Sequence, residues 1–368
     1  MRAVLVTGAA GLIGSHLCEA FAQAGWEVRA LDRPGSDLAV AAAAGATPAF
    51  VELSTPEGAL AAAELARGAA LVAHAAFPGA DRKEEALAMV RASMAAAVQA
   101  GAPMLLLSSA TVYGRPRNLP CDEGELKAPR TALERARWQA EQAAWLAFRQ
   151  GAPLTVLRPT LVYGPTLRSG AIRALALIAL FTRGHRRIPI VRRGPVMHLL
   201  HLQDLARAAV HVAEYPDDEA VVGRAFNVGD EAPLPLAEHL FAALEAMGHL
   251  PGRILPYSPR LTAALLWLVR SVPDRWLVEP ANRWLTAAWR ELAARAGAAD
   301  TLAPRLDRES LHWMAADHYY DTRRLGALGW RPLHPVSTAA LPETIRALLD
   351  ARLLPAPNPR GFLGGGAV

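Results

Sequence analysis

The sequence has few cysteines and no long hydrophobic run. Its two cysteines, Cys18 and Cys121, lack the spacing of a metal site or a redox pair, so free thiols are expected. The longest apolar stretches, residues 174–181 and 261–269, are shorter than the roughly 18 residues that a membrane-crossing helix requires. The chain opens on a strand pattern without the arrangement of a signal peptide. A cytoplasmic protein is therefore expected. Whether it also contacts a membrane peripherally stays open.

Lysine is also scarce, because Lys83 and Lys127 are the only two and arginine supplies the remaining positive charge. The net charge of +5 and the pI near 9.6 could suit nucleic acid or an anionic membrane. No basic block with interleaved aromatic residues stands out, so nucleic-acid binding is not expected. A hydrophobic fraction of 52% with 20% charged residues indicates a globular protein with a substantial core.

A glycine-rich stretch, RAVLVTGAAGLIG, lies between a short branched apolar run and a helical pattern. Gly8 permits a tight turn, Gly11 lets the backbone approach a pyrophosphate, and Gly14 lets the helix pack closely on the strand. The N–H groups at the helix start, around Leu12 and Ile13, would face the phosphates. Strand, glycine turn and helix in this order predict a dinucleotide site.

The second predicted strand, residues 26–31, ends at an acidic residue. Asp32 follows Gly14 at the distance expected of a carboxylate that accepts both ribose hydroxyls of NAD. Arg33 is adjacent and could instead bind the extra phosphate of NADP. Because the acid occupies the strand end itself, NAD is favoured and NADP stays open.

Short apolar strands alternate with helical segments through the first half of the chain, which predicts a parallel, doubly wound sheet of six strands. Residues 1–165 are expected to form this dinucleotide-binding core, with 195–230 returning to it. Residues 166–194 and 231–350 are expected to form a smaller, mostly helical substrate lobe. Residues 351–368 are expected to be a mobile tail.

The glycine spacing G-x-x-G-x-x-G, with Thr7 before it and Ser15-His16-Leu17 after it, resembles the extended short-chain dehydrogenase/reductase family, the NAD-dependent epimerases and dehydratases. Further segments match this family in order along most of the chain. They are Glu52-Leu53 at the end of the third predicted strand (residues 48–53), His74-Ala75-Ala76, the stretches 108–114, 158–165, 201–206 and 225–229, and a closing signature at 320–332. The resemblance implies a Rossmann-type α/β fold with a smaller, mostly helical C-terminal lobe.

The same resemblance implies which residues contact the cofactor. Glu52 and Leu53 would flank the adenine, and His74, Ala75 and Ala76 would let the cofactor lie against the backbone. The remaining implied contacts come from Ser108, Pro159 and Arg137.

Carbonyl chemistry in this family uses a serine or threonine, a tyrosine, and a lysine four residues after the tyrosine. Ser109 matches the hydroxyl that orients the substrate oxygen. Glu141-Gln142 resembles the acidic residue that follows the lysine in this family. Counting back from that pair, the lysine position is Arg137 and the tyrosine position is Leu133. Arg137 could still bind the ribose hydroxyls, because it has several donors and stays charged. Leu133 cannot transfer a proton.

The proton donor is therefore unknown, and five residues are speculative candidates for it. No tyrosine occurs between Tyr113 and Tyr163, and Lys127 lies outside the expected helix. The candidates are Glu134, Tyr113, Tyr163, Cys121 and Asp122. His198 and His201 are three residues apart, but no metal site is expected there, and His201 and Asp204 are interpreted as structural.

The substrate is expected to be an apolar hydroxyl or ketone. Nucleotide-sugar members carry an asparagine after the sixth strand and an arginine before the histidine–aspartate signature, and both are missing here. Tryptophans and arginines interleave between residues 261 and 297, and this part resembles the sterol and 3β-hydroxysteroid dehydrogenase branch. Peripheral membrane contact through 261–297 and packing of this segment on the core or on a second subunit both stay open.

Two functions remain open from the sequence. The first is an NAD-dependent oxidoreductase, or a relative that performs epimerase or dehydratase chemistry, with a non-standard proton donor. The alternative is a non-catalytic NAD(H)-binding sensor or scaffold subunit that has lost the tyrosine. Leu133 favours the alternative, whereas the intact glycine turn, Asp32 and Ser109 favour the enzyme.

Overall fold

A computed structural model describes residues 2–167, 171–307, 314 and 316–356. The chain divides into two compact units. Unit 1 holds the residues up to Thr160 together with Leu202–Gly229 and Tyr320–Leu333, and unit 2 holds the rest. Each unit is described by itself.

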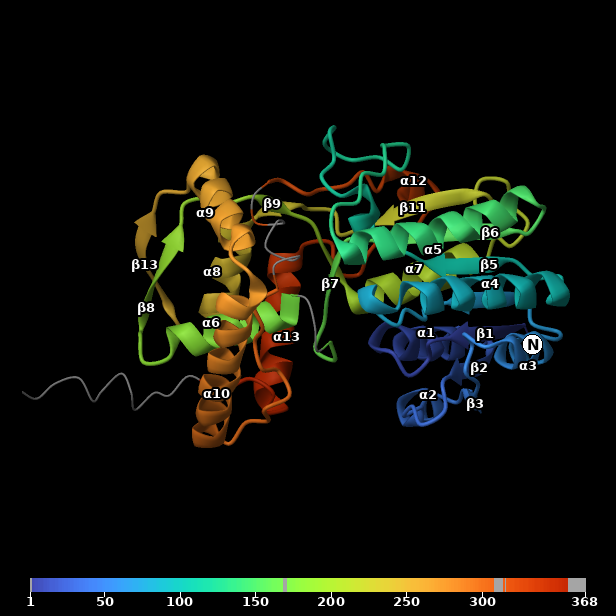
Figure 1. Cartoon of the computed structure of the whole chain (residues 1–368), viewed down its shortest axis with the longest axis horizontal. Coiled ribbons are helices and arrows are strands. Elements are labelled where there is room, and N and C mark those ends of the chain that lie inside the picture. The colour runs from blue at the N-terminus through green and yellow to red at the C-terminus, as the bar shows by residue number, and fades with distance from the viewer. Residues whose placement is uncertain (1, 168–170, 308–313, 315, 357–368) are drawn as a thin grey trace, which may run out of the picture. The chain divides into compact units, whose positions relative to one another are not determined.

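Unit 1 is built on a seven-stranded sheet in which every neighbouring pair is parallel. The order across the sheet is β11-β6-β5-β4-β1-β2-β3 (Figure 1). The strands are β1 (Ala3–Thr7), β2 (Glu27–Asp32), β3 (Thr47–Phe50), β4 (Leu71–His74), β5 (Met104–Leu107), β6 (Leu154–Pro159) and β11 (Arg224–Val228). The doubly wound Rossmann-type fold is confirmed.

The prediction of six strands was one too few. The seventh strand, β11, comes from the segment 195–230 that was expected to return to the core, and its Phe226 pairs with Leu157 of β6. Its isolated position in the sequence hid this, because a strand far along the chain reveals its partner only once the chain has folded.

Helices connect the strands of unit 1. They are α1 (Leu12–Gln23), α2 (Ala39–Ala43), α3 (Pro56–Leu65), α4 (Lys83–Ala100), α5 (Ala132–Arg149), α7 (Leu202–Ala213) and α12 (Arg323–Ala327), with short 3-10 turns η1 (Ala80–Arg82) and η2 (Ala110–Tyr113). The start of α5 is fixed by a capping box, in which the Thr131 side chain accepts from the Glu134 N–H and the Glu134 side chain accepts from the Thr131 N–H. This cap sets which residues of α5 face the sheet.

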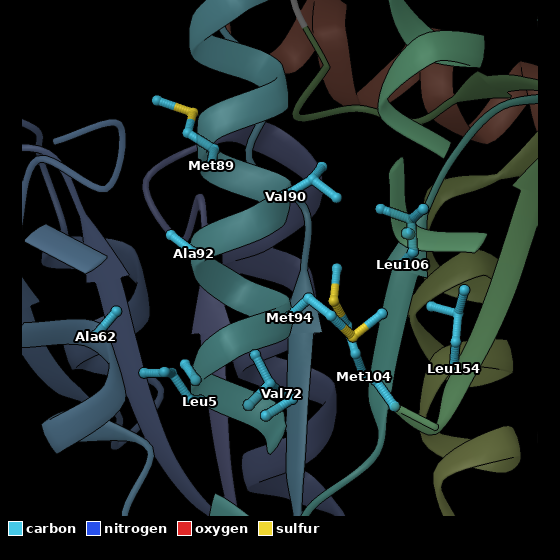
Figure 2. Close-up of a cluster of buried hydrophobic side chains, with 14 of the residues drawn as sticks. Leu5, Ala62, Val72, Met89, Val90, Ala92, Met94, Met104, Leu106 and Leu154 are labelled. Atoms are coloured by element: carbon cyan, nitrogen blue, oxygen red, sulfur yellow. The ribbon is translucent and has the colours of Figure 1, made fainter. Parts of the chain in front are cut away.

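The core of unit 1 lies between α4 and the sheet. Figure 2 shows the side chains of Met94 on α4, Val72 on β4 and Met104 on β5 pointing toward one another. Val72 and Met104 are fully buried, and so is Leu5 on β1. Burial of such side chains supplies most of the stabilising free energy that holds the strand ends in place.

Unit 2 combines short two-stranded sheets with longer helices. Its strand pairs are β7 (Leu161–Tyr163) with β10 (Leu199–His201), β8 (Arg187–Val191) with β13 (Leu250–Leu255), and β9 (Val196–Met197) with β12 (Leu234–Pro235). Its helices are α6 (Ala171–Thr182), α8 (Leu236–Ala246), α9 (Pro259–Ser271), α10 (Val278–Ala296) and α13 (Ser337–Asp350), with a 3-10 turn η3 (Asp274–Trp276). Trp289 of α10 is its largest fully buried side chain.

The unit boundaries differ from the expected ones at three places. Unit 1 ends at Thr160, residues 195–201 group with unit 2, and residues 320–333 group with unit 1. The last segment belongs there because the Asp321 N–H donates to the Cys121 carbonyl at 2.9 Å and Arg324 donates to the Ala225 carbonyl at 3.1 Å. Of the expected mobile tail, residues 357–368 lie outside the described residues.

Among the described helices, none is long and apolar enough to cross a membrane.

Candidate active site in unit 1

The glycine turn closes tightly against the end of β4. Gly8 has a φ of +75°, which favours glycine, and a Cβ there would lie 2.6 Å from the Ala76 Cα. A Cβ on Gly14 would lie 2.0 Å from the Gly8 carbonyl oxygen, whereas one on Gly11 would lie 3.0 Å from it. Gly8 and Gly14 are therefore required by the backbone, and Gly11 is the more tolerant position.

The N-terminus of α1 is open to a ligand. Gly11 is its N-cap, no side chain caps it in the described structure, and its first turn contains no acid. Leu12 and Ile13 are partly exposed, so their backbone N–H groups can face an anion. The positive end of the helix dipole adds to this attraction. The geometry fits a pyrophosphate.

Asp32 connects the end of β2 to the glycine turn. Its carboxylate accepts hydrogen bonds from the Ala10 N–H at 2.9 Å, and from the Arg33 N–H and the Ser36 hydroxyl at 2.8 Å each. A carboxylate has about four acceptor positions, so one remains for a ribose hydroxyl. Arg33 itself is exposed. Both the acid and the arginine thus lie where the sequence predicted.

Glu52 and Leu53 lie beyond the strand to which they were assigned. Because β3 ends at Phe50, both residues occupy the turn before α3. Leu53 is buried, and the Glu52 carboxylate accepts from the Ser54 hydroxyl at 2.6 Å. The position is still at the carboxyl end of the sheet, where ligands of such folds bind.

His74 holds the end of β4 in place. Its Nδ1 lies 2.8 Å from the Thr7 hydroxyl and 2.8 Å from the Ser93 hydroxyl, which joins β1, β4 and α4. Burial lowers the pKa of the ring to about 4, so the imidazole is neutral at pH 7. Ala75 and Ala76 follow and are partly exposed beside the glycine turn. Thr7 and Ser93 carry no sequence signal for this contact.

Ser109 caps the turn that follows β5. Its oxygen accepts hydrogen bonds from the Thr111 N–H at 3.2 Å and the Thr111 hydroxyl at 3.0 Å. Both bonds use the oxygen as acceptor, which leaves the hydroxyl hydrogen of Ser109 available to donate. The neighbouring Ser108 hydroxyl donates inward to Glu141 at 2.6 Å, and Pro159 is buried at the end of β6.

Arg137 and Leu133 lie one turn apart on α5, as the sequence predicted. The Arg137 guanidinium stacks on the ring of Phe77, just after β4, at 4.1 Å from its centroid. Desolvation lowers the pKa of this guanidinium to about 10, so the charge persists at pH 7. Within the described residues it has neither a hydrogen bond nor a carboxylate partner. An unneutralised, partly buried cation suits a polar or anionic ligand.

A buried polar network fixes α5 on the sheet. Glu141 and Arg158 form an ion pair with side chains 0% and 3% exposed. Arg158 also donates to the Tyr113 hydroxyl at 2.8 Å, and that hydroxyl donates to Asn227 Oδ1 at 2.8 Å. The network ties α5, β6, η2 and β11 together. In the sequence, Glu141 served only to locate the lysine and tyrosine positions, and no role was predicted for Arg158 or Asn227.

Four of the five proton-donor candidates lie in unit 1, and each has another partner. Burial raises the pKa of the Tyr113 hydroxyl, which is enclosed in the network above, and raises the pKa of the Cys121 thiol to about 12. Glu134 closes the capping box, and Asp122 accepts from the Gly124 and Glu125 N–H groups. These contacts therefore identify none of the four as the proton donor of the reaction. Tyr163 lies in unit 2.

The histidine and aspartate side chains of the later signature bond to the main chain. In unit 2, His198 Nε2 lies 2.8 Å from the Asp230 carbonyl oxygen. In unit 1, Asp204 accepts from the Leu333 N–H at 2.6 Å and His211 lies 3.0 Å from the Leu328 carbonyl oxygen. These contacts agree with a structural interpretation of Asp204. The His201 ring packs against Tyr163 and His334 within unit 2.

The parallel sheet, the glycine turn at its carboxyl edge and Asp32 together define a Rossmann-type dinucleotide-binding protein. A sequence model of the NAD dependent epimerase/dehydratase family matches residues 4–229. The chain belongs to this family, and its cofactor is NAD(H).

A curated relative and two solved structures show the similarity in more detail. Ceramide reductase from Caulobacter vibrioides is 30% identical over 224 residues, which is 58% of this chain and 61% of that protein's length. UDP-glucose 4-epimerase from Thermotoga maritima has 17% identity and a TM-score of 0.66, with 95% of this chain and 100% of that chain covered. A dTDP-glucose 4,6-dehydratase from Bacillus anthracis in complex with NAD has 15% identity and a TM-score of 0.66, covering 95% and 97%. At these identities the two structures show the shared fold.

Proposed function

We propose that this chain is an NAD-dependent oxidoreductase that interconverts a hydroxyl and a ketone on an apolar substrate. Family membership supports the class of reaction. Arg137 carries the proposal that the site holds a ligand: at the position that the resemblance gives to lysine, it keeps a charged guanidinium, stacked on Phe77, that has no carboxylate partner among the described residues. Burying an unpaired charge is unfavourable, so its retention favours a ligand that pairs with it.

The residues that would hold NAD are in unit 1. The N–H groups of Leu12 and Ile13 would bind the pyrophosphate, and Asp32 would accept from the adenosine ribose. Arg137 would donate to the nicotinamide ribose. When bound, the nicotinamide supplies or receives the hydride at its C4. An acid at position 32 disfavours the 2′-phosphate of NADP, which agrees with NAD as the cofactor.

Ser109 is proposed to orient the substrate oxygen through its hydroxyl hydrogen. In the reductive direction the carbonyl carbon gains the hydride and the oxygen gains a proton. Tyr113, Glu134, Cys121 and Asp122 are engaged in the contacts described above. The proposal therefore takes this proton from a water molecule beside Ser109, which is left as hydroxide; in the reverse direction hydroxide takes the proton back and becomes water.

Three observations support an apolar substrate. Members of the family that act on nucleotide sugars carry an asparagine after the sixth strand and an arginine before the histidine–aspartate signature, and this sequence lacks both. The related protein of Caulobacter vibrioides bears a name that specifies reduction of a lipid, ceramide. The resemblance of the C-terminal segment to the sterol and 3β-hydroxysteroid branch points the same way. The proposed substrate class is a long-chain or polycyclic lipid ketone or alcohol.

The test is to assay NADH oxidation with a panel of lipid ketones, and NAD reduction with the matching alcohols. Parent protein and the double variant Leu133→Tyr with Arg137→Lys are compared. Turnover by the parent is expected. Turnover by the double variant alone would instead support the sensor or scaffold alternative, which Leu133 motivates and the family comparisons do not favour.

A further inference from the structure

Two stretches of the chain, residues 142–203 and 246–273, contain no aspartate or glutamate. They are far apart in the sequence, yet they meet in unit 2, where β8 and β13 pair in parallel. Exposed arginines lie on and around this pair: Arg186, Arg187, Arg192 and Arg193 near β8, and Arg253 on β13. Five exposed arginines are therefore grouped at this strand pair, in stretches of sequence that contain no acid.

Helix α9 follows β13 directly and presents apolar side chains to solvent. No described side chain of α9 is buried. Leu261, Leu265 and Leu268 are 60%, 54% and 55% exposed, and Trp267 is 69% exposed. The three leucines are spaced by four and three residues, so they form one face of the helix. We call Leu261, Leu265, Leu268 and Trp267 the α9 face.

The α9 face differs from the helix that follows it. Helix α10 also carries tryptophans and arginines, but it buries Leu285, Ala288, Trp289 and Ala293. Its apolar face is thus used in the packing of unit 2, while that of α9 is not. Contiguous exposed apolar side chains mark an interaction site.

We propose that the α9 face and the arginines of the β8–β13 pair dock unit 2 on an anionic lipid surface. Three leucines on one helical face, with an exposed tryptophan beside that face, suit insertion at the boundary between headgroups and acyl chains. Arginines from two stretches that contain no acid suit the negative headgroups beside it. This charge complementarity favours a lipid surface over a second copy of the chain, which carries the same basic charge at this face. The inference does not depend on turnover.

The experiment is co-sedimentation of the full chain with lipid vesicles. Vesicles of phosphatidylcholine alone are compared with vesicles in which part of that lipid is replaced by phosphatidylglycerol. Binding is expected to the anionic vesicles, to weaken as salt is raised, and to shift the tryptophan emission to the blue in a way that Trp267→Phe reduces. The triple variant Leu261→Ser, Leu265→Ser and Leu268→Ser is expected to lower binding about tenfold or more.

Matched control variants show whether vesicle binding depends on these particular residues or on any exposed apolar or basic side chain of the protein. Leu60 and Val98 are 71% and 56% exposed in unit 1, so Leu60→Ser with Val98→Ser should leave vesicle binding unchanged. Replacing Arg186, Arg187, Arg192 and Arg193 by glutamine should weaken binding, whereas Arg67→Gln with Arg149→Gln should not. Circular dichroism and NADH binding show that each variant is folded.

Several outcomes would overturn the proposal. These are absence of binding by the folded parent, unchanged binding by the folded leucine variant, and equal binding to both kinds of vesicle. A fourth is a dimer in light scattering that the leucine variant abolishes, which would assign the α9 face to a second copy.

Discussion

At the residue scale, Arg137 and Leu133 separate binding of the cofactor from its use. Both lie on α5, one turn apart, at the positions where the resemblance drawn from the sequence implies a lysine and a tyrosine. Arginine keeps the charge and the donors of lysine, whereas leucine keeps nothing of the chemistry of tyrosine. The structure adds that the Arg137 guanidinium stacks on Phe77 and has no carboxylate partner among the described residues.

Arg137→Leu is expected to weaken NADH binding about tenfold or more, because it removes charge-assisted hydrogen bonds to the ribose. The same change should leave the free energy of unfolding unchanged or raise it, since an unpaired, desolvated charge is removed. Fluorescence titration with NADH and urea unfolding measure the two quantities. Arg137→Lys serves as the control and should retain most of the binding. Weaker stability with normal binding would contradict this role.

Gly14→Ala is expected to abolish NADH binding, because a Cβ at this position would lie 2.0 Å from the Gly8 carbonyl oxygen. Gly11→Ala should have a smaller effect, since its Cβ would meet the same oxygen at 3.0 Å. Titration with NADH compares the two variants. Equal loss in both would show that contact with the cofactor, rather than the geometry of the turn, decides the outcome.

At the element scale, the position of α5 depends on a few buried polar groups. Glu141 lies one turn beyond Arg137 on α5 and pairs with Arg158 of β6. Arg158 also donates to the Tyr113 hydroxyl, which in turn donates to Asn227. A buried ion pair contributes little net stability over an apolar pair, but breaking it leaves one charge unpaired. The network therefore positions the site more than it strengthens the fold.

Glu141→Gln is expected to lower the free energy of unfolding by about 3–5 kcal/mol, because the Arg158 charge loses its partner in a buried place. The matched control is Glu291→Gln, whose pair with Arg295 is exposed and should cost less than about 1 kcal/mol. Urea unfolding followed by circular dichroism measures both. Similar losses in the two variants would contradict the cost assigned to leaving the buried Arg158 charge without its partner.

Much of unit 1 could be predicted from the sequence because its signals are local. The glycine turn, Asp32 and the strands that follow one another each combine a short apolar run with a punctuating residue. The position of β11 in the sheet, the return of residues 320–333 to unit 1 and the Asn227 contacts could not be predicted, because each depends on partners about seventy residues or more away. Glu52 and Leu53 were misplaced because strand ends are the least certain part of a pattern.

At the scale of the whole molecule, stability is expected to depend on the protonation of His74. The folded ring has a pKa of about 4 and the ordinary value is 6.5, so the unfolded chain binds more protons between these pH values. The contribution of neutral His74 is complete above pH 6.5 and is lost as the pH falls toward 4. The expected loss is roughly 2–3 kcal/mol.

The measurement is urea unfolding as a function of pH, compared with His74→Asn. The variant should be less stable at neutral pH, because the bonds to Thr7 and Ser93 change, and its stability should vary less between pH 6.5 and 4. An equal pH dependence in both proteins would assign the effect to other groups.

The central claim is that the site both binds NAD(H) and uses it, with Ser109 orienting the substrate oxygen. The direct test is single-turnover oxidation of enzyme-bound NADH on mixing with a lipid ketone, for the parent and for Ser109→Ala. We expect oxidation by the parent, a rate lower by about a hundredfold in Ser109→Ala, and unchanged NADH affinity in both. Bound NADH that the parent never oxidises, with any member of the ketone panel, would contradict the account.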